Sequence, residues 1–367
     1  MPAAGAKHSW SDSMPGRKDK LLSEKMYTER YIRELQNRTG KDPSLLERVV
    51  YAFGLLEAIC RAELPFCFKG GTALMLLLEH PGRLSTDIDI IVEPGTDIMP
   101  YIRKAGEIFP FTDVEEQSRA GKGNIVKRHF RFHYDSPRSG RSVAILLDVL
   151  FERLPYGNMT ERPIRNELLL TEGEDLCVSM PNENEILGDK LTAFAPHTAG
   201  IPFGAGKELE IIKQLFDCAC LFEAMTDFSE VKDTWEKVVQ TELQYRGIQT
   251  APEEVLQDTI DACLCIASRG IPEGDYAYYK DGISRIRSHI LRGKFSGEIA
   301  GAYACRVLYL AVSILRGQNT VMRIEDASAY SGQTVGLDRP RRFSYLRFAD
   351  PLSMGYLIEA GKLLTGH

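Results

Sequence analysis

Two aspartates separated by a single residue are the feature of this sequence most suggestive of chemistry. Asp87 and Asp89 alternate with Ile88 and Ile90, and a β-strand directs residues two apart to the same face. The two carboxylates are therefore expected to project together while the isoleucines enter a core. Neighbouring carboxylates repel, so each makes ionisation of the other more costly. A divalent cation would relieve this repulsion, and oxygen ligands of this kind suit Mg²⁺.

A glycine turn lies upstream of these aspartates, in residues 66–74, which read FCFKGGTAL. Such a turn offers backbone N–H groups and a threonine hydroxyl to a phosphate chain. The turn and the acids together predict a site for a metal-bound nucleoside triphosphate. A structural interpretation is also open. The glycines could serve only a turn that needs positive φ, and the aspartates could form the solvated face of an edge strand.

A third acid, Asp148, interrupts residues 142–151, which are otherwise apolar and rich in branched side chains. This composition predicts a strand that is buried on both faces. Aspartate is rarely buried without a partner, because removing its charge from water is costly. We therefore favour a functional role for Asp148 over a structural one at the end of a strand.

These residues resemble the first motif of the polymerase-β type of nucleotidyltransferases, in which a glycine turn and a spacer precede Asp-x-Asp. The segment around Arg83 and Ser85 is more similar still to the AbiEii/AbiGii toxin family, which includes the mycobacterial MenT toxins. The resemblance covers about residues 45 to 225. It implies that a third acid on a neighbouring strand completes the metal site, a position that Asp148 fits. The cofactor expected at the three acids is Mg²⁺ or Mn²⁺.

Lys190 belongs to a predicted helix that begins after the capping residues near 182. It shares an edge with apolar side chains, so its ammonium group must extend to solvent or reach an anion. It could bind the β- and γ-phosphates and offset charge as pyrophosphate leaves. The family resemblance also places a lysine here, with Glu185 and Lys190 matching the pattern.

Asp217 lies four residues after Lys213 in a helical pattern, which predicts at least a simple surface ion pair. In the family this segment reads basic-Asp-x-x-Asp and supports the nucleotide or the lysine. Here Gln214 replaces the first acid while Asp217 keeps the second, and both interpretations stay open. The predicted nucleotide-binding set is Lys69, Gly70, Gly71, Thr72, Arg83, Ser85, Lys190 and Asp217. The predicted catalytic set is Asp87, Asp89, Asp148 and Lys190.

A basic segment precedes the strand of Asp148. Between residues 119 and 141 there are seven Lys or Arg residues and one acid. Basic and aromatic side chains beside a catalytic sheet could hold a polyanion through phosphate contacts and stacking. Lys127, Arg128 and Arg131 are therefore candidate RNA contacts. The alternative is a half-exposed strand with an ordinary solvated face, and the sequence does not choose between the two.

The chain has 367 residues and a formal net charge of −6. This balance excludes avid, indiscriminate binding of nucleic acid through overall charge, although it allows a local basic patch. The first 20 residues lack the apolar segment of a signal peptide. The longest apolar stretch, residues 303–315, contains Arg306 and is too short to span a membrane. These features predict a soluble cytoplasmic protein.

The order of predicted elements favours an α+β fold. We expect a small mixed β-sheet with flanking helices, the nucleotidyltransferase core, followed by a mostly helical C-terminal domain. The expected divisions are a flexible tail at 1–20, N-terminal helices packing on the core at 21–60, the core at 61–175, and the helical domain at 176–367.

The predicted activity is metal-assisted transfer of NMP from an NTP to an acceptor hydroxyl, with release of pyrophosphate. The family resemblance implies that the acceptor is RNA, namely the 3′ end of tRNA. It also implies a toxin–antitoxin or phage-abortive-infection system with a cognate antitoxin. Two alternatives are a transferase that modifies a small molecule such as an aminoglycoside, and a non-catalytic member that binds a nucleotide or a protein.

Overall fold

The computed structural model describes residues 21–117, 126–204, 206–271 and 274–366. The flexible tail predicted at residues 1–20 lies outside this part of the chain. So do residues 119–125 of the basic segment.

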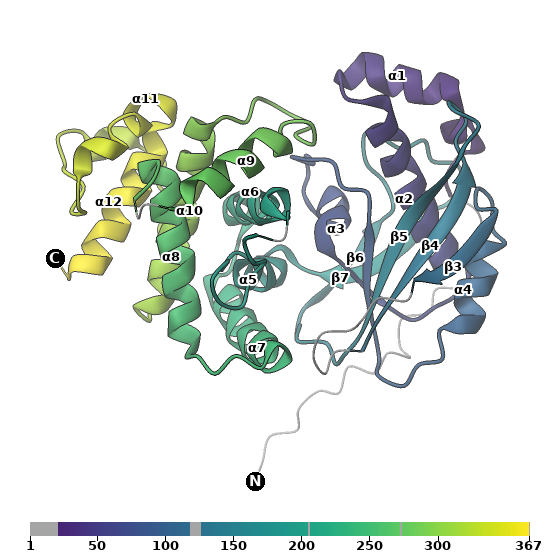
Figure 1. Ribbon diagram of the computed structural model, residues 1–367, viewed down its shortest axis with the longest axis horizontal. Helices are drawn as coiled ribbons and strands as arrows, with labels where there is room; N and C mark the ends of the chain where they lie inside the picture. The colour runs from purple at the N-terminus through teal and green to yellow at the C-terminus, as the bar shows by residue number, and fades with distance from the viewer. Residues whose placement is uncertain (1–20, 118–125, 205, 272–273, 367) are drawn as a thin grey trace, which may run out of the picture.

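A five-stranded mixed sheet forms the N-terminal half of the molecule (Figure 1). In spatial order its strands are β1 (Cys67–Lys69), β2 (Ile88–Val92), β5 (Ser142–Phe151), β4 (Lys127–Asp135) and β3 (Asp113–Gln117). Strands β2 and β5 are parallel, and the other neighbours are antiparallel. The predicted α+β class with a small mixed sheet is confirmed.

Helices from the N-terminal segment cover one face of this sheet. They are α1 (Glu29–Thr39) and α2 (Pro43–Arg61), and α4 (Met99–Gly106) lies beside α2. Helix α2 begins at Asp42, whose carboxylate accepts hydrogen bonds from the backbone N–H groups of Ser44 and Leu45. Such a cap satisfies N–H groups that the first turn leaves unpaired. Ile88 and Ile90 are buried as expected.

Strand β5 differs from its prediction because only one of its faces is well buried. Ile145, Leu147 and Val149 are buried, while Asp148, between two of them, keeps 39% of its side chain exposed. The apolar composition of the strand suggested burial on both faces. The second face instead borders a cavity, so Asp148 meets solvent without the full cost of burying a carboxylate.

Three strands escaped the sequence-based prediction. One is β3, at the edge of the main sheet. The others, β6 (Met159–Pro163) and β7 (Cys177–Pro181), form a separate antiparallel pair. This pair joins residues on both sides of the predicted boundary at 175/176, so the two predicted regions share a structural element there.

The C-terminal part of the chain is mostly helical, as predicted, and packs beside the sheet (Figure 1). The α-helices of this half are α5 (Glu183–Ala193), α6 (Glu208–Ala224), α7 (Phe228–Arg246), α8 (Pro252–Ser268), α9 (Tyr276–Ile286), α10 (Gly297–Leu315), α11 (Leu346–Ala349) and α12 (Pro351–Thr365). Short 3-10 helices are η1 (Glu24–Tyr27), η2 (Ala327–Tyr330) and η3 (Pro340–Phe343). Helices α5, α6 and α7 lie nearest the sheet in Figure 1.

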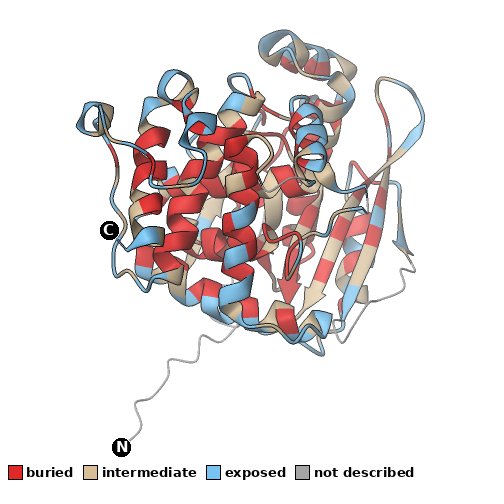
Figure 2. Cartoon of the chain, turned by 60° about the vertical axis from the view of Figure 1, so that its left-hand side comes forward, coloured by how far each residue is buried: buried red, intermediate tan, exposed pale blue. Residues whose placement is uncertain are grey.

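Helix α10 corrects the expectation that no apolar stretch reaches membrane-spanning length. Within the described residues it is the one helix that is long and apolar enough, yet 78% of its apolar window is buried inside the protein. Its neighbours are α6, α8 and α12. Arg306 on this helix pairs with Glu223 and Asp350. These contacts make α10 a core helix, and Figure 2 shows how buried residues gather where the helices meet.

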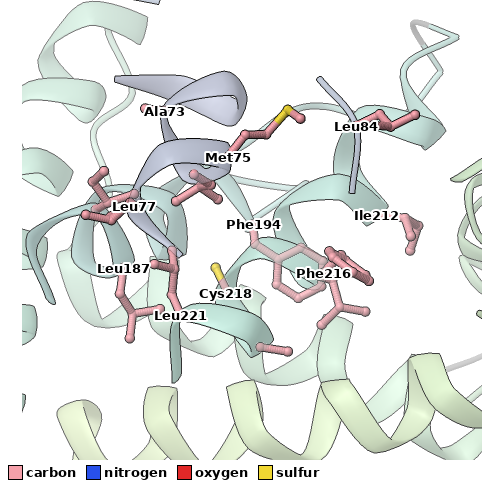
Figure 3. Packing of buried hydrophobic residues seen from close by; sticks show 14 of the residues in the cluster. Ala73, Met75, Leu77, Leu84, Leu187, Phe194, Ile212, Phe216, Cys218 and Leu221 are labelled. Carbon is pink, nitrogen blue, oxygen red and sulfur yellow. The ribbon is translucent and has the colours of Figure 1, made fainter. Parts of the chain in front are cut away.

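A short helix, α3 (Gly70–Leu77), connects the sheet with the helical half. Its buried residues Ala73, Met75 and Leu77 belong to the same apolar cluster as Leu187 on α5 and Leu221 on α6 (Figure 3). Burial of such side chains contributes about 1.5–3 kcal/mol each. The packing therefore fixes the start of α3, where the glycine turn lies, relative to α5 and α6.

Candidate active site

The glycine turn packs so closely against the first acids that side chains would not fit. Gly70 has φ +84°, and a Cβ built on it would lie 2.0 Å from Oδ2 of Asp89. A Cβ on Gly71 would lie 2.7 Å from the Arg83 guanidinium and 2.8 Å from Oγ of Ser85. Glycine is required here both for the positive φ and for the close approach. The turn thus brings backbone directly beside an acid and a cation.

The structure brings the three predicted acids to one cavity of about 360 Å³. Asp87 immediately precedes β2, Asp89 lies within it, and Asp148 is the register partner of Asp89 on the parallel strand β5. The same cavity is lined by predicted residues from the turn, from the segment before β2 and from helix α5. They are Lys69, Gly70, Gly71, Arg83, Ser85 and Lys190.

The carboxylates of Asp87, Asp89 and Asp148 repel one another, so their ionisation is costly unless a metal ion is bound. Burial, followed by the carboxylates of Asp148 and Asp87, raises the pKa of Asp89 to about 7, although Lys69 and Lys190 act in the opposite direction. Burial also raises the pKa of Asp87, against the opposing effects of Arg48 and Lys213. Carboxylates that are held together in this way resist ionisation unless positive charge is supplied.

His129 is the closest partner of Asp148. Its Nδ1 lies 2.6 Å from Oδ1 of Asp148, because the two residues are opposite each other in the β4–β5 register. The sequence gave no sign of this contact, which depends on how β4 and β5 are aligned.

Asp217 does not form the surface ion pair with Lys213 and lies instead beside Arg83 and Lys190, the lysine that the family resemblance associates with it. Its side chain is 1% exposed, and its two oxygens accept hydrogen bonds from Arg83 at 2.7 and 2.6 Å. Lys190 lies 2.8 Å from the same carboxylate and 3.3 Å from the amide oxygen of Gln214. Burial disfavours ionisation, but the cations outweigh it and hold the pKa of Asp217 below its usual value. Asp217 thus positions two cations and does not line the cavity itself.

Lys213 does not form the expected surface pair with Asp217. It lies 2.9 Å from Glu210 instead, and both Lys213 and Glu210 line the cavity. The sequence-based set missed Glu210, and it missed Arg48 on α2, whose guanidinium lies 3.8 Å from Asp87. Arg48 is far from the motif along the chain and carries no local signal of its role.

Lys69 is held by a residue that the sequence analysis missed. Its ammonium lies 2.8 Å from Asp189, and the hydroxyl of Tyr156 donates to the same carboxylate at 2.7 Å. Burial opposes the charge on Lys69, but Asp189 raises its pKa well above the usual range. Asp189 directly precedes Lys190 and so belongs to the helix that the sequence predicted. Only the tertiary packing shows that its side chain reaches Lys69.

The predicted hydroxyl contact of Thr72 needs correction. Thr72 is fully buried, and its Oγ1 donates a hydrogen bond to the backbone carbonyl of Asp87 at 2.6 Å. This bond ties the start of α3 to the segment that carries the first acid. Thr72 therefore positions Asp87, and the turn presents its backbone to the cavity.

Two of the three candidate RNA contacts are engaged within the sheet. Arg128 forms a double hydrogen bond with Glu116 at 2.7 Å, and Arg131 lies 3.5 Å from Glu115. Both glutamates belong to β3, the strand that was not predicted. The local excess of positive charge is thus partly balanced by a neighbouring strand, while Lys127 lines a cavity that reaches Asp148.

The donor chemistry of the acids fits a hard divalent cation. No three acidic, histidine or cysteine side chains within the described ranges converge closely enough to hold a metal ion by themselves. Mg²⁺ seldom requires such a cage, because it takes one or two carboxylates together with substrate phosphates and water. Asp87 and Asp89 could supply that pair beside the glycine turn, with Asp148 adjacent in register.

A comparison with protein families identifies this constellation. Residues 55–289 match the profile described as "Nucleotidyl transferase AbiEii toxin, Type IV TA system". The chain belongs to the AbiEii family. The matched range contains the glycine turn, all three acids, Lys190 and Asp217, so this AbiEii protein is a nucleotidyltransferase of a toxin–antitoxin family.

Solved structures give more distant likenesses to this AbiEii protein. JHP933 from Helicobacter pylori is 14% identical, with a TM-score of 0.40 over 73% of this chain and 91% of that one. An antigenic nucleotidyltransferase-like protein from Paracoccidioides brasiliensis is 16% identical, with a TM-score of 0.35 over 56% of this chain and 94% of that one. Comparison with curated protein sequences gave no match.

Proposed function

We propose that this AbiEii protein transfers NMP from an NTP to the 3′ end of tRNA in the cytoplasm and needs Mg²⁺ or Mn²⁺ to do so. The observation that carries the proposal is the register of Asp89 against Asp148, with Asp87 and the glycine turn in the same cavity. Three mutually repelling acids beside exposed backbone suit a metal-bound triphosphate better than they suit a neutral or anionic ligand without metal.

In this proposal the chain's own residues divide into two groups. The backbone of Gly70 and Gly71 and the ammonium of Lys190 bind the β- and γ-phosphates, while Asp217, itself paired with Arg83, holds Lys190 in place. Asp87 and Asp89 would hold the metal, with Asp148 completing the site on the acceptor side. The bound metal would neutralise charge on the triphosphate and on the leaving pyrophosphate.

The proposed reaction is an in-line displacement at the α-phosphorus. The acceptor 3′-hydroxyl oxygen forms a bond to that phosphorus, and the bond to the bridging oxygen of the β-phosphate breaks. Pyrophosphate leaves toward Lys190, and the hydroxyl proton passes to Asp148, whose other contact is His129. Modified tRNA could not be aminoacylated, which would arrest growth until a cognate antitoxin acts.

The decisive experiment incubates the purified full-length chain with total tRNA and each α-³²P-labelled NTP in Mg²⁺. Label should enter RNA with the parent protein and not with Asp89→Ala. Label in a small molecule, with RNA unlabelled, would support the aminoglycoside-type alternative. Binding of NTP without any transfer would support the non-catalytic alternative.

A further inference from the structure

A second cavity, of about 390 Å³, is also lined by two of the three acids, Asp89 and Asp148. It shares Lys69, Asp89, Asp148 and Asp189 with the first cavity. Its other walls come from β4, from the segment after β5 and from the C-terminal part of α7. Asp89 and Asp148 therefore line both cavities, whereas Gly70, Gly71, Asp87 and Lys190 line only the first.

The linings of the two cavities differ, and this difference indicates which one would hold the leaving pyrophosphate and which the attacking hydroxyl. In-line transfer requires the attacking oxygen and the leaving pyrophosphate to lie on opposite sides of the α-phosphorus. Lys190 and the backbone of the glycine turn, which suit pyrophosphate, line the first cavity and not the second. The attacking hydroxyl must then approach from the second, where Asp148 is also exposed.

The second cavity is lined by charges of both signs, and two of its cations are more exposed than its carboxylates. Lys127 and Arg153 are exposed cations that line it. Glu152 and Glu242, both half-buried, also line it, and the hydroxyl of Tyr245 donates to Glu152 at 3.0 Å. Carboxylates repel a phosphate but accept hydrogen bonds from ribose hydroxyls and from base amino groups. An aromatic ring beside them can stack on a base.

We propose that this second cavity binds the 3′-terminal nucleoside of a single-stranded RNA acceptor, with Lys127 and Arg153 contacting the phosphate that precedes it. The inference rests on the proposed function and specifies its acceptor site. Its size suits one nucleoside, because small-molecule sites begin at about 300 Å³. Protein recognition of RNA commonly targets such unpaired ends, with bases stacked on aromatic side chains.

The test measures RNA binding separately from transfer. Fluorescence anisotropy with a 5′-fluorescein oligoribonucleotide ending in a free 3′-hydroxyl would compare the parent with the double variant Lys127→Ala/Arg153→Ala. We expect binding to weaken about tenfold or more and the slope of log Kd against log salt to fall by about 0.7 per lost phosphate contact. Lys237→Ala, which removes an exposed cation of α7 outside the cavity, should behave like the parent.

A second variant examines the interior of the cavity. Tyr245→Ala removes a half-buried ring at the end of α7 and should weaken RNA binding about tenfold through lost stacking. An oligonucleotide that ends in a 3′-phosphate should bind the parent more weakly, because Glu152 and Glu242 repel the added charge. Affinity for the NTP, measured by calorimetry, should stay within about twofold for each variant.

The possible outcomes test RNA binding by the second cavity separately from nucleotide transfer. Variants that weaken NTP binding and leave RNA binding unchanged would assign the cavity to the donor nucleoside and overturn the inference. RNA binding that is absent in the parent, or unchanged in both variants, would also overturn it. If the parent binds RNA through these residues yet transfers no nucleotide, the acceptor site stands and the proposed reaction fails.

Discussion

Asp89 on strand β2 and Asp217 on helix α6 are both largely withdrawn from solvent, but the fold surrounds them differently. Asp217 has Arg83 and Lys190 as fixed partners at 2.6 to 2.8 Å, and they hold its pKa low. Asp89 has two other carboxylates as neighbours, and with burial they raise its pKa to about 7. Asp217 is neutralised by cations of the chain itself, whereas under the proposed function Asp89 is neutralised by a bound metal ion.

This difference separates residues that build the site from residues that react in it. A buried acid with matched cations stabilises the positions of those cations. A cluster of acids without enough cations costs stability and persists where a ligand relieves the repulsion. The distances in the Asp217 group and the register of Asp89 against Asp148 therefore predict opposite responses to substitution.

The largest expected effect is that of Asp217→Ala on folding. Removing this carboxylate leaves Arg83 and Lys190 buried without their partner, which should lower the free energy of unfolding by about 3–5 kcal/mol. Urea denaturation followed by circular dichroism would measure it. Asp281→Ala, which breaks an exposed pair with Arg285, is the control and should cost less than about 1 kcal/mol. Equal losses in both variants would show that burial of the Asp217 group contributes nothing.

Asp89→Asn should impair activity and not stability, the reverse of the pattern expected for an acid that only builds the site. We expect nucleotide transfer to fall about 10²–10³-fold or more, as when a group that stabilises charge in the transition state is lost. Stability should be maintained or increased, because the substitution removes repulsion with Asp87 and Asp148. Steady-state kinetics and thermal unfolding would measure the two effects. Asp113→Asn, at an exposed position of β3 in the same sheet, should change neither. A strongly destabilised Asp89→Asn would place this acid with Asp217 as a structural residue.

Gly70→Ala tests the contact between the turn and Asp89. Positive φ should cost about 1–2 kcal/mol for alanine, and displacement of Asp89 should lower kcat about tenfold to a hundredfold. Gly95→Ala is a matched control, because Gly95 has φ +88° and a Cβ there meets nothing within 4 Å. The control should lose similar stability and keep its activity. Equal activity in the two variants would show that the close approach to Asp89 has no catalytic consequence.

The smallest expected effect is a difference in pH dependence. The folded pKa of Asp89 is raised, so the folded protein binds this proton more tightly and loses stability as pH rises from about 4 to about 7. Asn at position 89 should remove that loss. The low pKa of Asp217 acts in the opposite sense, because its contribution is present above pH 4 and is lost as acid protonates it. Unfolding free energies of parent and Asp89→Asn at pH 5 and 8 would reveal a gap that widens with pH.

Mg²⁺ should remove this difference in unfolding free energy between the parent and Asp89→Asn. Saturating metal should raise the melting temperature of the parent at pH 8, by preferential binding to the folded state, and leave Asp89→Asn nearly unchanged. An equal shift in both proteins would indicate that the metal binds elsewhere.

Much of the site could be predicted because its signals are local. The alternation of Asp87 and Asp89 with isoleucines marks a strand, the two glycines mark a turn, and the position of Lys190 on α5 follows from helical spacing. For the basic strand, the sequence left two interpretations open. Its charge was counted along the chain, whereas Glu115 and Glu116 neutralise Arg131 and Arg128 from a strand that only sheet formation places beside them.

The sequence by itself determined which chemical groups are present and which of them share a strand face, a turn or a helix. These relations span a few residues and follow from backbone geometry. Tertiary structure alone decided that Arg83 meets Asp217, 134 positions away, that Lys69 meets Asp189, and that His129 meets Asp148. The first two contacts depend on how the sheet packs against α5 and α6, and the burial of apolar surface that drives this packing is non-directional. The third depends on the alignment of β4 with β5.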